Sequence, residues 1–205
     1  SQLKFHKDNN AEVTLYLTKV DDARAYGCVE LAGDNSVKSF LEKMENPVSN
    51  LINAGCYIFN RNIIDSIPKG KVVSVERDTF PSLLNAGSKV YGYLDNAYWL
   101  DIGTPAALVK ASADLVTGVI KSGATLEHTG DRIISDTAVI NSSALINNGS
   151  VIDGEVIVES NTQISGSIIG KGAKIGKNCK IIDSIIAPGT QIDAGMVVIS
   201  NYLGF

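Results

Sequence analysis

Histidine and cysteine are scarce in this chain of 205 residues, which has two histidines and three cysteines. The cysteines, Cys28, Cys56 and Cys179, form no CxxC pair. With so few histidines beside them, the usual ligand set of a zinc site is missing. We therefore expect three buried, reduced thiols and a reducing, cytoplasmic compartment.

Long apolar runs and an excess of basic residues are lacking as well. No uninterrupted apolar stretch approaches the roughly 18 residues that a membrane-spanning helix needs. Lysine and arginine number 18 against 22 acidic residues, so the formal net charge is −4 at pH 7. Because no bulk positive field exists, we expect neither a nucleic-acid partner nor a membrane partner.

Aromatic residues almost disappear in the second part of the chain. Of the 13 aromatic residues, only Tyr202 and Phe205 lie beyond residue 120, whereas 16 of the 23 isoleucines do. So sharp a change in composition indicates a domain boundary near Ile120–Gly123. We expect one domain over residues 1–120 and a second over residues 121–205.

The second part repeats with a period of six residues. Aliphatic residues follow one another at this spacing with two five-residue steps, as Ile140, Ile146, Ile152, Val158, Ile164, then Ile169, Ile175, Ile181, then Ile186, Ile192, Val198. Such a period is the signature of a parallel β-helix built from hexapeptides, in which each aliphatic side chain points into a narrow prism. The pattern resembles the left-handed β-helix of hexapeptide-repeat proteins.

A β-helix by itself does not define a function. Hexapeptide helices form the catalytic domains of acyltransferases, and they also serve as trimerising or regulatory appendages. The acyltransferases usually place a histidine on a coil, but the coils contain none here and His128 precedes them. The lysines Lys171, Lys174, Lys177 and Lys180 occupy turn and outer positions, which indicates a solvated face.

The first part mixes strands and helices. Alternating residues 11–20, a hairpin of residues 29–31 and 37–40, and short apolar runs at 54–59 and 90–94 predict strands. Residues 61–67 and 76–84 predict helical segments. Thr104 and Pro105 supply a cap and a first-turn proline for a helix that ends near residue 116. The class is α/β.

Four clusters in this part stand in an informative order. They are Tyr26-Gly27-Cys28-Val29, Phe40-Leu41-Glu42-Lys43, Asn53-Ala54-Gly55-Cys56-Tyr57-Ile58-Phe59 and Tyr98-Trp99-Leu100-Asp101-Ile102-Gly103-Thr104-Pro105. In this order and spacing they resemble the sugar-1-phosphate nucleotidyltransferases, and the stretch VSVERDTFPSLL is most similar to the mannose-1-phosphate guanylyltransferases. Met44 departs from the family pattern, which has proline there.

The resemblance implies a partial Rossmann-like nucleotidyltransferase domain followed by the β-helix, and it implies a role for each matched residue. The residues that would bind the sugar phosphate are Gly27, Glu42, Lys43, Asn53 and Gly55. Glu42 would accept hydrogen bonds from the sugar hydroxyls, and Lys43 would donate them to the phosphate group. Asp101 would be the catalytic Mg²⁺ ligand. Tyr98 and Trp99 would pack beside the site.

The implied reaction joins a nucleoside triphosphate, GTP by this similarity, to a sugar 1-phosphate, mannose 1-phosphate by the same similarity. Oxygen of the sugar phosphate attacks the α-phosphorus, which releases pyrophosphate and leaves a nucleotide sugar. Such chemistry depends on positioning and charge neutralisation. We also expect a homo-oligomer, as the β-helix offers contacts between copies.

The family pattern also has a glycine-rich phosphate loop, G-G-x-G-T-R-L-x-P-x-T, and a second magnesium aspartate in G-D-x-L. Neither occurs in these 205 residues. We therefore expect the nucleotide-binding half, about 110 residues by family size, to lie outside them, and the 205 residues alone to be inactive. Two alternatives stay open: a non-catalytic regulatory or assembly homologue, and a hexapeptide acyltransferase.

Overall fold

The computed structural model describes residues 1–120 and 130–205, which form two compact units, Ser1–Trp99 and Leu100–Phe205. His128 and most of the predicted boundary segment Ile120–Gly123 lie outside the described residues. The division at Trp99 reflects packing, whereas the boundary near residue 120 reflects composition. The two criteria differ over one helix, α4 (Pro105–Val116), which packs on the second unit. The domain boundary near residue 120 therefore stays a prediction.

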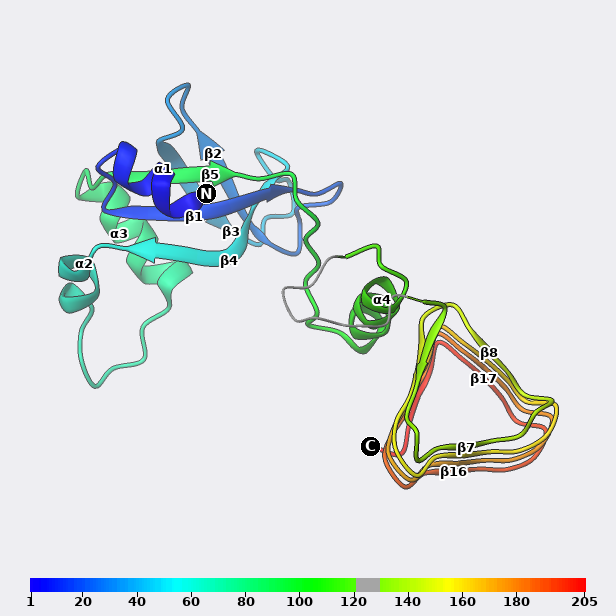
Figure 1. Cartoon of the computed structure of the whole chain (residues 1–205). Helices are drawn as coiled ribbons and strands as arrows, with labels where there is room; N and C mark the ends of the chain where they lie inside the picture. Colours follow the sequence, from blue (N-terminus) through cyan, green and yellow to red (C-terminus); the bar gives the residue numbers. More distant parts are fainter. Residues whose placement is uncertain (121–129) are drawn as a thin grey trace. The chain divides into compact units, whose positions relative to one another are not determined.

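The first unit is built on one mixed five-stranded sheet with the order β3-β2-β4-β1-β5 (Figure 1). Only β1 and β5 pair in parallel; the other neighbours are antiparallel. The strands are β1 (Val13–Lys19), β2 (Gly27–Leu31), β3 (Val37–Glu42), β4 (Leu51–Phe59) and β5 (Val90–Leu94). All the strands expected from the apolar pattern of residues 1–120 are present, including the β2–β3 hairpin.

Aromatic side chains in the core of the first unit pack around one buried phenylalanine. Phe80 is fully buried, and its ring contacts those of Phe40, Tyr57 and Phe59 at centroid separations of 5.2 to 6.1 Å. Aromatic pairs at such separations add to the stabilisation from buried area. Aromatic residues, which distinguish the first part of the sequence, thus pack the helical segment that begins at Phe80 against strands β3 and β4.

Four short helical segments accompany the sheet: α1 (Gln2–Asp8), α2 (Arg61–Ser66), η1 (Val75–Thr79) and α3 (Phe80–Asn85). The helix expected over residues 76–84 is present, but its first turn, η1, is a π-helix. Ser74 caps that turn, because its hydroxyl accepts a hydrogen bond from Arg77 N at 3.1 Å. Such π-turns are rare and occur often at functional sites.

A bulge interrupts β4 where it pairs with β1. Leu15 pairs with Tyr57 and Leu17 pairs with Asn53, so three residues of β4, Ala54 to Cys56, stand against one residue of β1. Gly55 has φ +80°, a left-handed conformation that glycine adopts without a steric penalty. Cys56 is exposed in this bulge, so the expectation of three buried thiols is wrong for it. Cys28 and Cys179 are buried, and all three cysteines are unpaired.

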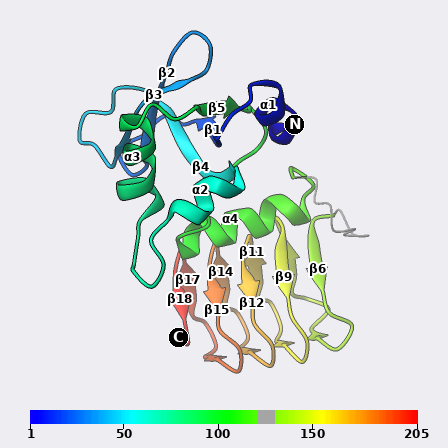
Figure 2. The ribbon, with the colours of Figure 1, turned by 90° about the vertical axis from the view of Figure 1, so that its left-hand side faces the viewer.

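The second unit is a parallel β-helix, as the period of six predicts. Its three sheets form the sides of a triangular prism, and successive coils stack strand on strand (Figures 1 and 2). The strands are β6 (Arg132–Ile134), β7 (Val139–Ile140), β8 (Leu145–Asn147), β9 (Ser150–Ile152), β10 (Ile157–Val158), β11 (Gln163–Ser165), β12 (Ile168–Ile169), β13 (Lys174–Ile175), β14 (Lys180–Ile182), β15 (Ile185–Ile186), β16 (Gln191–Ile192), β17 (Val197–Ile199) and β18 (Tyr202–Leu203).

The predicted aliphatic ladder fills the prism. Ten of its eleven residues are buried, and Ile140, in the first full coil, is partly buried against the same core. Ala173 and Cys179, also expected inside, are 0% and 2% exposed. The four lysines between residues 171 and 180 are all exposed, as expected for turn and outer positions.

Helix α4 begins as the sequence predicts and lies along one corner of the β-helix (Figure 2). Thr104 caps it, since its side chain accepts from Ala107 N at 3.2 Å, and Pro105 occupies the first turn. Close packing requires Gly149, where a β-carbon would lie 2.6 Å from the α-carbon of Ala113. The helix therefore belongs to the second unit.

The burial pattern predicts how two isoleucines differ in their effect on stability. Ile164 is 0% exposed in the prism, so Ile164→Ala should lower the free energy of unfolding of the β-helix by about 2–5 kcal/mol. Ile199 is 54% exposed on the outer face and serves as the matched control, with an expected change within about 0.5 kcal/mol. Denaturant unfolding followed by circular dichroism measures both; equal losses would contradict the inward orientation of Ile164.

Candidate functional site

Glu42 and Gly27 face each other across strands β3 and β2. They are register partners, and a β-carbon on Gly27 would lie 2.9 Å from Glu42 Oε2 and 2.7 Å from the Phe40 ring. The carboxylate can lean over Gly27 only because that residue has no side chain. Glu42 Oε2 is buried and has no hydrogen-bond partner among the described residues. A buried acceptor without a donor costs about 1–3 kcal/mol, so this oxygen is ready to accept from a ligand.

Lys43 follows directly and is exposed. Its ammonium nitrogen lies 4.0 Å from Glu42 Oε1, and 62% of its side chain is accessible. The backbone of Lys43 has φ +49°, an uncommon conformation for a residue with a side chain, and its N–H donates to Tyr26 O at 3.1 Å. The backbone therefore turns sharply where the strand ends, beside Tyr26 and Gly27.

Asn53 lies in the strand next to Gly27. Cys28 of β2 pairs with Ile52 of β4 in antiparallel orientation, so the next residues, Gly27 and Asn53, lie on the same side of this pair. Asn53 is 7% exposed, and its Oδ1 accepts from Gly55 N at 3.1 Å, which ties the side chain to the bulge. The order of strands β3, β2 and β4 thus brings Glu42, Gly27 and Asn53 into one row across the sheet.

Two residues of this site were not identified from the sequence, Tyr57 and Glu76. Asn53 Nδ2 donates to Tyr57 OH at 2.6 Å and to Glu76 Oε1 at 2.7 Å. The Tyr57 hydroxyl in turn donates to the same Glu76 oxygen at 3.4 Å. Both residues stand in stretches that carry the family resemblance, but nothing in their spacing indicates that they meet.

The environment of the Tyr57 hydroxyl is electronegative. Burial raises its pKa above 10, and the neighbouring Glu76 and Glu42 carboxylates raise it further, against a lowering by the hydrogen bond from Asn53. The phenol therefore stays protonated at neutral pH, and its proton remains available for Glu76.

The structure confirms that Trp99 packs beside these residues. Its indole N–H donates to Ala54 O at 3.1 Å, and its ring meets Tyr26 edge to face at 5.7 Å. Trp99 thus touches both the bulge of β4 and the residue before Gly27.

Asp101 belongs to the second unit, Leu100–Phe205. It is exposed, and its Oδ1 accepts from Gly103 N at 3.0 Å in the turn that leads into α4. Among residues 1–120 and 130–205, no cluster of three or more His, Cys, Asp or Glu side chains could hold a metal ion. A lone exposed carboxylate nevertheless fits Mg²⁺, which commonly takes one or two protein carboxylates and completes its shell with phosphates and water.

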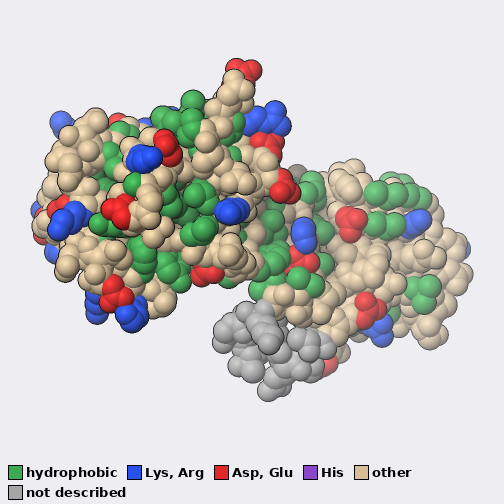
Figure 3. All heavy atoms as spheres, turned by 90° about the horizontal axis from the view of Figure 1, so that it is seen from above, with side chains coloured by type: hydrophobic (Ala, Val, Ile, Leu, Met, Phe, Trp, Pro, Cys, Tyr) green, Lys and Arg blue, Asp and Glu red, His purple; other side chains and the backbone are tan. Residues whose placement is uncertain are grey.

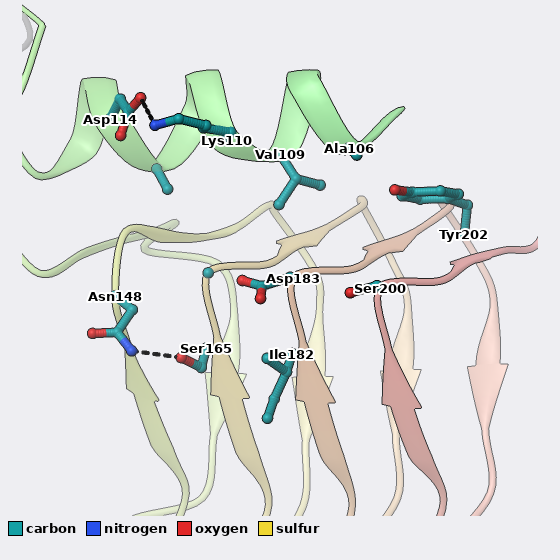
Figure 4. A pocket seen from close by; sticks show the side chains of 12 residues that line it. Ala106, Val109, Lys110, Asp114, Asn148, Ser165, Ile182, Asp183, Ser200 and Tyr202 are labelled. Atoms are coloured by element: carbon teal, nitrogen blue, oxygen red, sulfur yellow. Dashed lines mark hydrogen bonds and ion pairs between the residues drawn. The ribbon is translucent and has the colours of Figure 1, made fainter. Parts of the chain in front are cut away.

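A cavity of about 470 Å³ lies between α4 and the coil corners of the β-helix (Figure 4). Several of its polar side chains already pair with each other: Lys110 with Asp114 at 2.6 Å, and Asn148 with Ser165 at 2.7 Å. None of the residues predicted from the sequence lines it.

The surface carries charges of both signs. Basic and acidic side chains are interspersed on the face drawn in Figure 3, with no extended area of one sign. In the part of the chain that the structure describes, no helix has the length and apolar character to cross a membrane.

Comparison with known families identifies two matched regions of the chain. The profile of the nucleotidyl transferase family matches residues 1–118, and that of the GlmU-like C-terminal hexapeptide matches residues 111–202. Since the first match covers more than half of the chain, the chain belongs to the nucleotidyl transferase family.

Three individual proteins with similar sequences are informative. A mannose-1-phosphate guanylyltransferase of Mycobacterium tuberculosis is 51% identical over 140 residues, which are 68% of this chain and 39% of the relative. A mannose-1-phosphate guanyltransferase of Yarrowia lipolytica is 41% identical over 50% of this chain and 28% of its own. A glucose-1-phosphate adenylyltransferase of Clostridium botulinum is 36% identical over 56% of this chain and 32% of its own. The chain thus spans well under half the length of these relatives.

Proposed function

We propose that this chain forms the sugar-phosphate side of an enzyme that transfers guanylate from GTP to mannose 1-phosphate. The products are GDP-mannose and pyrophosphate. One observation carries the proposal: Glu42 Oε2 is buried beside Gly27 and has no partner among the described residues. A sugar hydroxyl supplies the donor that this oxygen lacks. The 51% identity to a mannose-1-phosphate guanylyltransferase supports mannose and guanine over other sugars and bases.

Each residue of the site has a role that suits its chemistry. Glu42 accepts from sugar hydroxyls, and the Gly27 backbone approaches the sugar ring where a side chain would block it. The exposed Lys43 donates charge-assisted hydrogen bonds to the phosphate. Asn53 and Gly55 contact the same sugar phosphate from the bulge of β4.

The reaction needs positioning and charge neutralisation rather than a nucleophilic side chain. The phosphate oxygen of the sugar attacks the α-phosphorus of GTP, a bond to phosphorus forms, and the bond to the pyrophosphate oxygen breaks. Lys43 orients the attacking phosphate. Asp101 would hold Mg²⁺, which supplies charge neutralisation at the triphosphate when bound.

The two alternatives have weaker support. An acyltransferase needs a histidine near the coils, and residues 130–205 contain none. A regulatory homologue needs no sugar-phosphate residues, yet Glu42, Lys43 and Asn53 retain the family's residue types.

The expectation of a homo-oligomer draws support from apolar side chains on the outer faces of the β-helix, such as Val139, Leu145 and Val197, each about 60% exposed.

Removal of the Lys43 charge should weaken binding of mannose 1-phosphate. A hydrogen bond to a charged group contributes about 1.5–3 kcal/mol, so Lys43→Ala should raise the dissociation constant by roughly 10- to 100-fold. Isothermal titration calorimetry on the 205-residue chain measures this constant. Lys38→Ala is the matched control, because Lys38 is an exposed lysine on β3, the strand that Lys43 directly follows, and pairs with Glu30 at 3.5 Å. Equal losses in the two variants would contradict the assigned role.

The role of Asp101 is tested by turnover. The glycine-rich phosphate loop does not occur in these residues. Pyrophosphate release is therefore measured on an extended protein, in which a nucleotide-binding half of the family is joined before residue 1. Asp101→Ala should lower turnover at least about 100-fold, the order lost when one charge-stabilising group is removed. Asp136→Ala, an exposed aspartate on the β-helix, should leave turnover unchanged.

The 205-residue chain alone should release no pyrophosphate from GTP and mannose 1-phosphate.

Full activity of Asp101→Ala in the extended protein would refute the assignment of Asp101 as a metal ligand.

A further inference from the structure

The side-chain amide of Asn53 has a fixed orientation. Its Nδ2 end faces Glu76 Oε1 at 2.7 Å and Tyr57 OH at 2.6 Å, and its Oδ1 end faces Gly55 N at 3.1 Å. An ionised carboxylate only accepts hydrogen bonds, and a backbone N–H only donates them. Glu76 therefore requires the nitrogen of the amide on its side, and Gly55 requires the oxygen on the other.

Glu76 reaches this position because of the π-turn that carries it. The turn η1 is closed by the Ser74 hydroxyl and by Asp78, whose carboxylate accepts from Ser74 N at 2.9 Å. Phe80 follows at once and is buried against Phe40 and Tyr57. The turn is thus anchored to the same strands whose side chains Glu76 contacts, so the position of the Glu76 carboxylate relative to Asn53 is set by packed elements.

Gly55 depends on the orientation that Glu76 sets. Its N–H lies in the bulge, where the backbone has φ +80° and the regular ladder to β1 is broken. The Asn53 oxygen takes the place of the missing ladder partner. Were the amide turned over, an NH₂ group would face the Gly55 N–H, two donors would meet, and the bulge would lose this restraint.

We infer that Glu76, with Tyr57, is a positioning residue of the sugar-phosphate site, which fixes the Asn53 amide and through it the bulge at Gly55. The ligand named in the test rests on the proposed function, whereas the positioning itself rests only on the contacts above. Glu76 need not touch the sugar phosphate for this role.

Two substitutions separate positioning from simple packing. Glu76→Ala removes the acceptor. Glu76→Gln keeps an amide oxygen that can accept from Asn53 and Tyr57 at the same place, so it should restore the arrangement. Arg77→Gln is the matched control, because Arg77 is the exposed next residue of the same turn and its guanidinium takes no part in the network.

The first readout is nuclear magnetic resonance of the chain labelled with ¹⁵N. The Asn53 side-chain NH₂ signals, identified by their loss in Asn53→Asp, and the Gly55 amide signal should shift in Glu76→Ala. They should keep their positions in Glu76→Gln and Arg77→Gln. Unchanged Asn53 and Gly55 signals in Glu76→Ala would overturn the inference, as would an equal shift in Arg77→Gln.

The second readout is affinity for mannose 1-phosphate, measured by calorimetry. Glu76→Ala should bind about tenfold more weakly, which corresponds to about 1.4 kcal/mol, and Glu76→Gln should bind within about threefold of the unchanged chain. If Glu76→Ala shifts the Asn53 signals but binds as tightly as the unchanged chain, the role in the site is overturned. If the unchanged chain fails to bind mannose 1-phosphate while the Asn53 signals shift as expected, the proposed function fails and the positioning stands.

Discussion

The candidate site depends on the bulge in β4. In a regular strand, residues four positions apart are about 13 Å apart, too far for a hydrogen bond between Asn53 and Tyr57 side chains. Their partners in β1, Leu17 and Leu15, are two positions apart, about 7 Å. The bulge shortens β4 to match, and the Asn53 amide then reaches the Tyr57 hydroxyl at 2.6 Å. Bulges next to functional sites commonly redirect side chains in this way.

The same bulge links the three parts of the site. Trp99 donates to Ala54 O within it, Asn53 holds Gly55 N, and the Glu76 turn contacts Asn53 from outside the sheet. Glu42 and Gly27 lie in the two strands beyond β4 in the sheet order. Gly27, Glu42 and Asn53 thus lie on one sheet, and the turn that carries Glu76 is held against this sheet by the packing of Phe80.

Much of the fold follows from the sequence because its causes are local or periodic. The β-helix ladder needs only an aliphatic residue at each inward position, and that period is visible in the residues themselves. The cap at Thr104 and the hairpin of β2 and β3 depend on neighbours within a few residues. The candidate residues Gly27, Glu42 and Asn53 were found by resemblance, and the strand order explains why they lie in one row.

What the sequence did not reveal depends on contacts between distant segments. Asn53 and Glu76 are 23 positions apart, and they meet only because a π-turn and a bulge both occur. Neither irregularity has a period. Cys56 was expected to be buried, as an unpaired cysteine commonly is, but it lies exposed in the bulge. Glycine 55 was the one signal of that irregularity, and it was assigned to ligand contact instead.

The central claim is that the row of Gly27, Glu42 and Asn53, with Lys43 and the bulge, binds a sugar 1-phosphate. Titration of mannose 1-phosphate into the ¹⁵N-labelled chain, followed residue by residue by nuclear magnetic resonance, tests it most directly. The account predicts that saturable shifts concentrate on the backbone amides of Gly27, Lys43 and Gly55 and on the Asn53 side chain, while residues of the β-helix keep their positions. Saturable shifts confined to the cavity between α4 and the β-helix, or no shifts at all, would contradict it.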